Sequence, residues 1–223
     1  MEKTNNQNYD YPSQPKVREG WRVEVSPKAL DQIGDRAEQI AWAFLRHTDF
    51  CPQTLFIYGS EGRFILQRPH PFDQGQEWFM ERGKLACVAA GAYACAFVSE
   101  AWAVRPQKVK QVNASRRPSE SPDRENVLTI AAESREGSIQ KVVTIRRNEE
   151  GKFVGHGETL MLDRDHVEDH SHFLTAEIPE KEMREKARIE LQAKGLDLEQ
   201  LREERILGRG EEEDRERGME KCR

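Results

Sequence analysis

The sequence predicts an α+β fold, in which an antiparallel meander sheet carries two helices packed on one face and continues into a charged helical C-terminal tail. Three observations lead to this fold class. Two stretches begin with the spacing of apolar residues that is typical of amphipathic helices. Short apolar runs then follow one another through tight turns, without the long crossovers that parallel strands require. Finally, 26 of the last 44 residues are charged.

These patterns divide the chain into four parts. Residues 1–20 are polar and should be disordered, because they contain almost nothing to bury. Residues 21–178 form the predicted single α+β domain. Residues 179–207 form a charged helical extension, and residues 208–223 are a run of charges that we expect to be disordered.

The first element is a predicted helix over residues 27–46. Ser26 is a favourable N-cap and Pro27 suits the first helical position. Seven apolar residues then recur at spacings of three and four, so they share one helical face that should pack on a sheet. They are Leu30, Ile33, Ala37, Ile40, Ala41, Phe44 and Leu45.

A hairpin and a second helix come next. Residues 54–68 read as two short strands around the turn Gly59-Ser60-Glu61-Gly62. Asp73 and Gln76 have the spacing of a capping pair at a helix start, and Gly91 is the predicted helix end. The end of this helix contains small apolar residues, which allow a close approach to a sheet.

The next strand, residues 93–105, is apolar on both alternating sets and should be central in the sheet and covered, at least in part, on both faces. A hairpin around Arg135-Glu136-Gly137 follows. The last strand candidate lies within residues 152–162, where Gly155 and Gly157 indicate a bulge. The tail then predicts a helix over 182–194 and a second from Asp197 to about Leu207. A thin apolar stripe could dock these helices on the chain's own domain or on a partner: Met183, Ala187, Leu191, Leu198 and Leu201.

Cysteine usage and hydropathy predict a cytoplasmic protein. The four cysteines form no C-x-x-C pair, so we interpret them as reduced thiols. No secretory signal is visible, and the longest uncharged run, residues 85–99, is too short to span a bilayer. The net charge of −5 argues against a protein whose whole surface binds nucleic acid, but it is compatible with a local basic patch.

The candidate site combines one strand with the loop that follows it. Glu100 and Trp102 share a face of the predicted central strand. The loop after it is basic and is stiffened by Pro118 and Pro122, and its candidate binding residues are Arg116, Arg117, Ser119, Asp123 and Arg124. In a structural interpretation, which we favour, Glu100 pairs with Arg117 or Arg124, since a partly buried carboxylate needs such a partner. In a functional interpretation, the arginines and Trp102 bind a carboxylate or phosphate of a ligand.

The same two segments carry a resemblance. "VSEAW" (residues 98–102) followed by "RPSESPDRENVL" (residues 117–128) resembles a motif pair in a group of uncharacterised bacterial and phage-associated proteins. The resemblance covers residues 93–133. It implies no activity, cofactor or substrate, but it does imply that the two segments belong to one domain and act together.

Catalytic and metal-binding patterns are weak. His166, His170 and His172 lie among acidic residues and could supply metal ligands, but a solvated loop accounts for them better. Ser60 imitates part of a nucleophile elbow with a misplaced glycine. We therefore expect no cofactor and a non-enzymatic binding or accessory protein, with a protein partner contacted through residues 105–124 and the tail. Nucleic-acid contact through the same loop and a metal-dependent enzyme using residues 166–172 are the alternatives.

Overall fold

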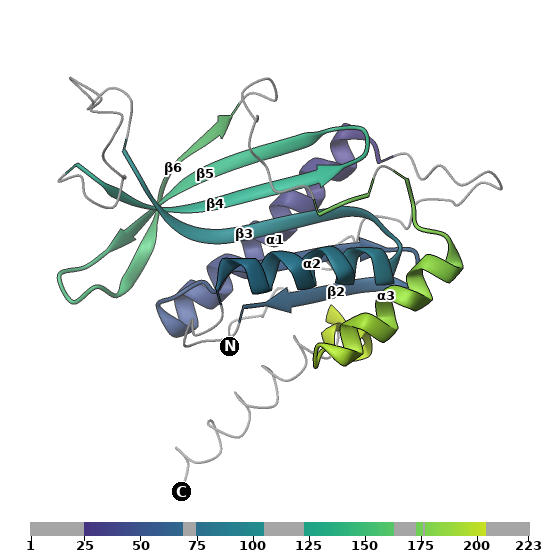
Figure 1. The fold of residues 1–223 in the computed structure, drawn as a ribbon. Coiled ribbons are helices and arrows are strands. Elements are labelled where there is room, and N and C mark those ends of the chain that lie inside the picture. Colours follow the sequence, from purple (N-terminus) through teal and green to yellow (C-terminus); the bar gives the residue numbers. More distant parts are fainter. Residues whose placement is uncertain (1–24, 69–74, 105–122, 163–172, 176, 204–223) are drawn as a thin grey trace, which may run out of the picture.

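The computed structural model describes residues 25–68, 75–104, 123–162, 173–175 and 177–203. Three α-helices, six strands and one short 3-10 helix follow one another in these residues (Figure 1). Their bounds are α1 Pro27–Thr48, β1 Thr54–Gly59, β2 Gly62–Gln67, α2 Gln76–Ala90, β3 Ala92–Ala103, β4 Glu125–Ser134, β5 Ser138–Arg147, β6 Phe153–Leu162, α3 Lys181–Ala193 and η4 Leu198–Leu201.

All six strands belong to one antiparallel sheet in the order β2-β1-β3-β4-β5-β6. This arrangement confirms the predicted α+β class. Both predicted hairpin turns are present, at residues 60–61 and 135–137. The ladder between β5 and β6 is irregular near Gly155, as the glycines of β6 predict.

Local sequence signals explain where the helices begin and end. The Ser26 hydroxyl accepts a hydrogen bond from the Ala29 N–H and caps α1, as predicted. Gly91 ends α2 in the left-handed conformation, with a φ of 58°. The N-cap of α2 is Gly75, and Asp73 lies outside the described residues.

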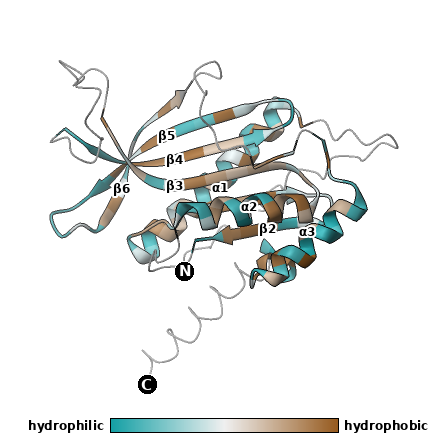
Figure 2. Ribbon diagram, in the orientation of Figure 1, coloured by the Kyte–Doolittle hydropathy of each residue, from teal (hydrophilic) through white to brown (hydrophobic). Residues whose placement is uncertain are grey.

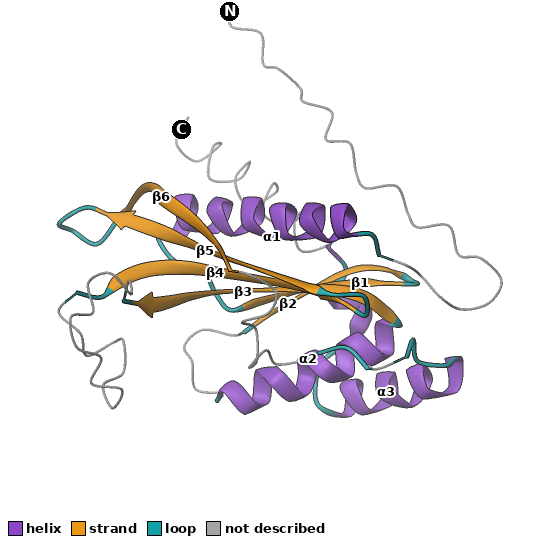
Figure 3. Ribbon diagram, turned by 90° about the horizontal axis from the view of Figure 1, so that it is seen from above, coloured by secondary structure: helices purple, strands orange, loops and turns teal. Residues whose placement is uncertain are grey.

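The prediction that both helices pack on one face of the sheet is wrong. α1 covers one face, whereas α2 and α3 cover the other (Figure 3). β3 shows the physical reason: Ala94, Ala96 and Val98 point into the α1 core, and the alternate Cys95 points into the α2 core. A central strand that is apolar on both faces needs cover on both sides. Hydrophobic residues accordingly extend along β2 and β3 (Figure 2).

The C-terminal segment docks on its own domain. We call residues 181–203, which include α3 and η4, the C-terminal strap. Ala187, Leu191, Leu198 and Leu201 are buried in the α2 core, whereas Met183 of the predicted stripe is 53% exposed. Within the described residues, the second predicted helix begins with the short η4, which Asp197 caps through the Glu199 N–H; the rest of its predicted span, from residue 204, lies outside the described part of the chain.

The strap also closes one edge of the sheet. Arg202 forms an antiparallel bridge with Phe64 on β2. The next residue, Glu203, is 6% exposed and forms ion pairs with Arg36 of α1 and Arg63 of β2. The strap therefore starts on the α2 face, crosses the β2 edge and is fastened to the helix on the opposite face.

Buried thiol and phenol groups predict a loss of stability at alkaline pH. Burial, with a further contribution from the nearby Glu100, raises the pKa of the Cys51 thiol to about 12. Burial likewise raises the pKa of the Cys95 thiol and of the Tyr58 phenol. Above about pH 9 the unfolded chain then binds fewer protons than the native chain, so the free energy of unfolding falls as the pH rises.

We expect a fall of about 1 kcal/mol per pH unit for each such group, measured by urea unfolding between pH 8 and pH 11. Cys51→Ala removes one of the groups and should make the slope shallower. Equal slopes for this variant and the natural chain would contradict the assignment to Cys51.

Candidate binding surface

Glu100 is a structural brace. Its side chain is 16% exposed, and both carboxylate oxygens are engaged. Oε1 accepts a hydrogen bond from the Cys51 N–H at 2.7 Å, and Oε2 accepts one from Arg147 Nη2 at 2.9 Å. The carboxylate thus joins β3 to the connection that follows α1 and to the end of β5.

Arg147 extends this brace. Its Nη1 donates to the carbonyl oxygens of Asp49 at 2.7 Å and of Gly151 at 3.0 Å. The Asp49 carboxylate, in turn, accepts a hydrogen bond from the Phe153 N–H at 2.8 Å. One guanidinium therefore ties together the end of α1, the β5–β6 turn and β3.

The structure supports the structural interpretation of Glu100, with Arg147 as its partner among the described residues. Arg124 does not pair with Glu100, and Arg117 lies outside the described residues. Arg147, the partner that the structure gives, was missed. The sequence did hold a signal: Lys141, Val143 and Ile145 alternate along the predicted strand, and Arg147 continues the same face.

Trp102 and Arg124 form an exposed pair at the neighbouring ends of β3 and β4. Trp102 is 43% exposed, and the Arg124 guanidinium carbon lies 4.6 Å from the centroid of the indole. The register explains the contact. Trp102 opposes Asn126, and Arg124 is two residues before Asn126, so it is the diagonal neighbour of Trp102 on the same face. In the sequence these two strand ends are connected by residues 105–122, which lie outside the described residues.

The structure thus divides the predicted site into two parts. Glu100 belongs to the brace, whereas Trp102, Asp123 and Arg124 lie at the exposed end of the strands. Arg116, Arg117 and Ser119 lie outside the described residues. We call Trp102, Asp123 and Arg124 the strand-end surface.

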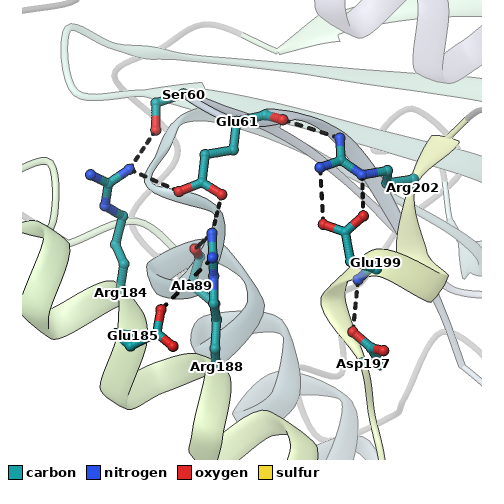
Figure 4. A network of polar contacts seen from close by, with 9 residues as sticks. All are labelled: Ser60, Glu61, Ala89, Arg184, Glu185, Arg188, Asp197, Glu199 and Arg202. Carbon is teal, nitrogen blue, oxygen red and sulfur yellow. Dashed lines mark hydrogen bonds and ion pairs between the residues drawn. The ribbon is translucent and has the colours of Figure 1, made fainter.

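A second polar cluster fastens the strap to the β1–β2 turn (Figure 4). Arg184 and Arg188 of α3 both form ion pairs with Glu61. Arg184 Nη1 also donates to the Ser60 hydroxyl at 2.8 Å, and Arg202 Nη1 donates to the Glu61 carbonyl at 3.1 Å. Ser60 therefore accepts a hydrogen bond from a cation, and this partner cannot take a proton from a serine nucleophile.

The sequence predicted only a turn at residues 59–62 and missed this cluster. The four-residue spacing of acidic and basic residues in the tail predicted ion pairs along the helix surface, such as Glu182–Lys186, and this pair is present. Nothing in the local spacing indicated that Arg184 and Arg188 would meet a turn more than 120 residues earlier.

The metal hypothesis cannot be placed on the fold. His166, His170 and His172 lie outside the described residues. Within the part of the chain that is described, no group of three or more His, Cys, Asp or Glu side chains is arranged to hold a metal ion.

Comparison with known proteins yields no relative. No family model, no curated protein and no solved structure matches the chain. Among the described helices, none is long and apolar enough to cross a membrane.

Proposed function

We propose that the chain is a non-enzymatic binding or accessory protein that contacts a protein partner through the strand-end surface and the adjoining loop, residues 105–122. The observation that carries this proposal is the exposed Trp102–Arg124 pair. Trp and Arg are the residue types that most often dominate the binding energy of protein interfaces.

The surroundings of the pair support this role. The brace of Glu100 and Arg147 lies two residues along β3 from Trp102 and fixes this end of the strand. A rigid support reduces the conformational entropy that is lost on binding. The strap contributes its apolar side chains to the body, so the proposal uses the loop and the strand ends rather than the tail.

A cytoplasmic location is part of the proposal. Cys51, Cys87 and Cys95 are buried free thiols, as expected for a chain that folds in a reducing compartment.

Nucleic acid is the second candidate partner. An exposed indole can stack on a base, and Arg124 adds positive charge beside it. This alternative predicts binding to single-stranded DNA or RNA that weakens steeply with salt. The net charge of −5 makes a protein partner the leading candidate.

A pull-down from a cell extract tests the proposal. The full-length chain should retain a partner that Trp102→Ala and Arg124→Ala each lose, with a reduction of at least about tenfold for a residue that dominates the interface. Met183→Ala is the matched control, because Met183 is also exposed but lies on α3. Equal recovery of the partner by all four proteins would contradict the proposal. If the natural chain instead forms a salt-sensitive complex with an oligonucleotide, and the Trp102 and Arg124 variants lose that complex, nucleic acid becomes the favoured partner.

A further inference from the structure

The two edges of the sheet differ. The β2 edge is bridged by Arg202 of the strap. At the other edge, no described strand pairs with the outer side of β6. An open strand edge presents unpaired N–H and C=O groups to any strand that can align with it.

β6 also exposes apolar side chains. Leu160 is 47% exposed and Met161 is 57% exposed. They point to opposite faces of the sheet. Met161 opposes Lys141, which forms an ion pair with Asp35 of α1, so Met161 lies on the α1 face. Leu160 opposes Val142 and therefore lies on the other face.

A single partner element that covers both side chains must itself have two faces. A helix laid on the sheet would cover only Leu160 or only Met161. An added β-strand places side chains on both faces at once and also satisfies the open backbone edge. The geometry therefore favours a strand as the occupant.

We infer that this strand is β6 of a second copy of the chain, paired antiparallel about a two-fold axis at Leu160. In this register Leu160 opposes Leu160 of the second copy, and Thr159 opposes Met161 on the other face. Residues 159–162 contain no charged side chain, so no like charges meet at the axis. This stretch also lies beyond the irregular part of the β5–β6 ladder. The result is a continuous twelve-stranded sheet across the dimer, in which the strand-end surface at β3 and β4 lies outside the new β6–β6 interface.

Analytical ultracentrifugation of the full-length chain tests the dimer. At about 50 µM the chain should sediment with twice its monomer mass. Leu160→Lys should restore the monomer, because two lysines would face each other at the axis. Ile189→Lys is the matched control: Ile189 is 62% exposed on α3, and this variant should remain dimeric.

Cross-linking tests the register even if the lysine variant folds poorly. Directly opposed residues of an antiparallel pair have Cα atoms about 4.5–5.5 Å apart, which a disulfide can span. Leu160→Cys, in a Cys222→Ser background, should therefore form a covalent dimer on mild oxidation, whereas Ile189→Cys in the same background should not. The inference would be overturned if the natural chain were a monomer. It would also be overturned if the natural chain were a dimer that Leu160→Lys does not dissociate and that Leu160→Cys does not cross-link. A monomer that binds a strand of another protein along β6 would overturn it as well.

Discussion

Replacing Glu100 with alanine is expected to lower the free energy of unfolding by about 3 kcal/mol or more, as measured by urea unfolding followed by circular dichroism. The substitution leaves the Arg147 guanidinium, 17% exposed, without its carboxylate and the Cys51 N–H without its acceptor. Uncompensated groups of this kind cost more than the lost contact itself, because water reaches them poorly.

A double-mutant cycle assigns this effect to the pair. Arg147→Ala should be similarly destabilising, and the double variant should cost clearly less than the two single losses together. The exposed pair Glu150–Lys152, with side chains 70% and 63% exposed, is the control, and Glu150→Ala should cost no more than about 1 kcal/mol. Strict additivity at Glu100 and Arg147 would mean that the two side chains act independently and that no brace exists.

Loss of the C-terminal strap is expected to have the largest effect on stability. A chain that ends at residue 180 lacks Leu191, Leu198 and Leu201, and it exposes the apolar surface of α2 together with the β2 edge. We expect this truncated chain to lose cooperative unfolding or to aggregate, since an uncovered edge beside an apolar surface recruits other strands. The measurement is thermal unfolding combined with light scattering.

Two point substitutions on α3 provide a milder version of the same test. Leu191 is fully buried, so Leu191→Ala should cost about 2–5 kcal/mol. Ile189 lies two residues away but is 62% exposed, and Ile189→Ala should change stability by no more than about 0.5 kcal/mol. If the truncated chain and Leu191→Ala were both as stable as the natural chain, the strap would not contribute to the stability of the domain, and this prediction would be wrong.

Local pattern was sufficient for most of the fold. The helix α1, the turns at residues 60–61 and 135–137 and the end of α2 at Gly91 follow from spacing, caps and turn residues. The two apolar sets of β3 also predicted a strand covered on both sides. The prediction that both helices lie on one face was inconsistent with that observation. In the structure, helices cover both faces of β3, as its two apolar sets require.

Long-range pairing explains what the sequence did not reveal. The carboxylate of Glu100 predicted a cationic partner, but several arginines were available, and two from the following loop, Arg117 and Arg124, were the predicted candidates. The true partner, Arg147, is 47 residues away and is brought close by the register of β3, β4 and β5. The ion pairs of Glu61 with Arg184 and Arg188 of the strap likewise depend on tertiary packing.

The most direct test of the division between brace and binding surface is the urea-unfolding free energy of Trp102→Ala. If Trp102 serves a partner, its loss should cost about 1 kcal/mol, the size of an exposed cation–π contact with Arg124. A loss of about 3 kcal/mol or more, as for a buried aromatic residue, would make Trp102 part of the core and would contradict its assignment to the strand-end surface.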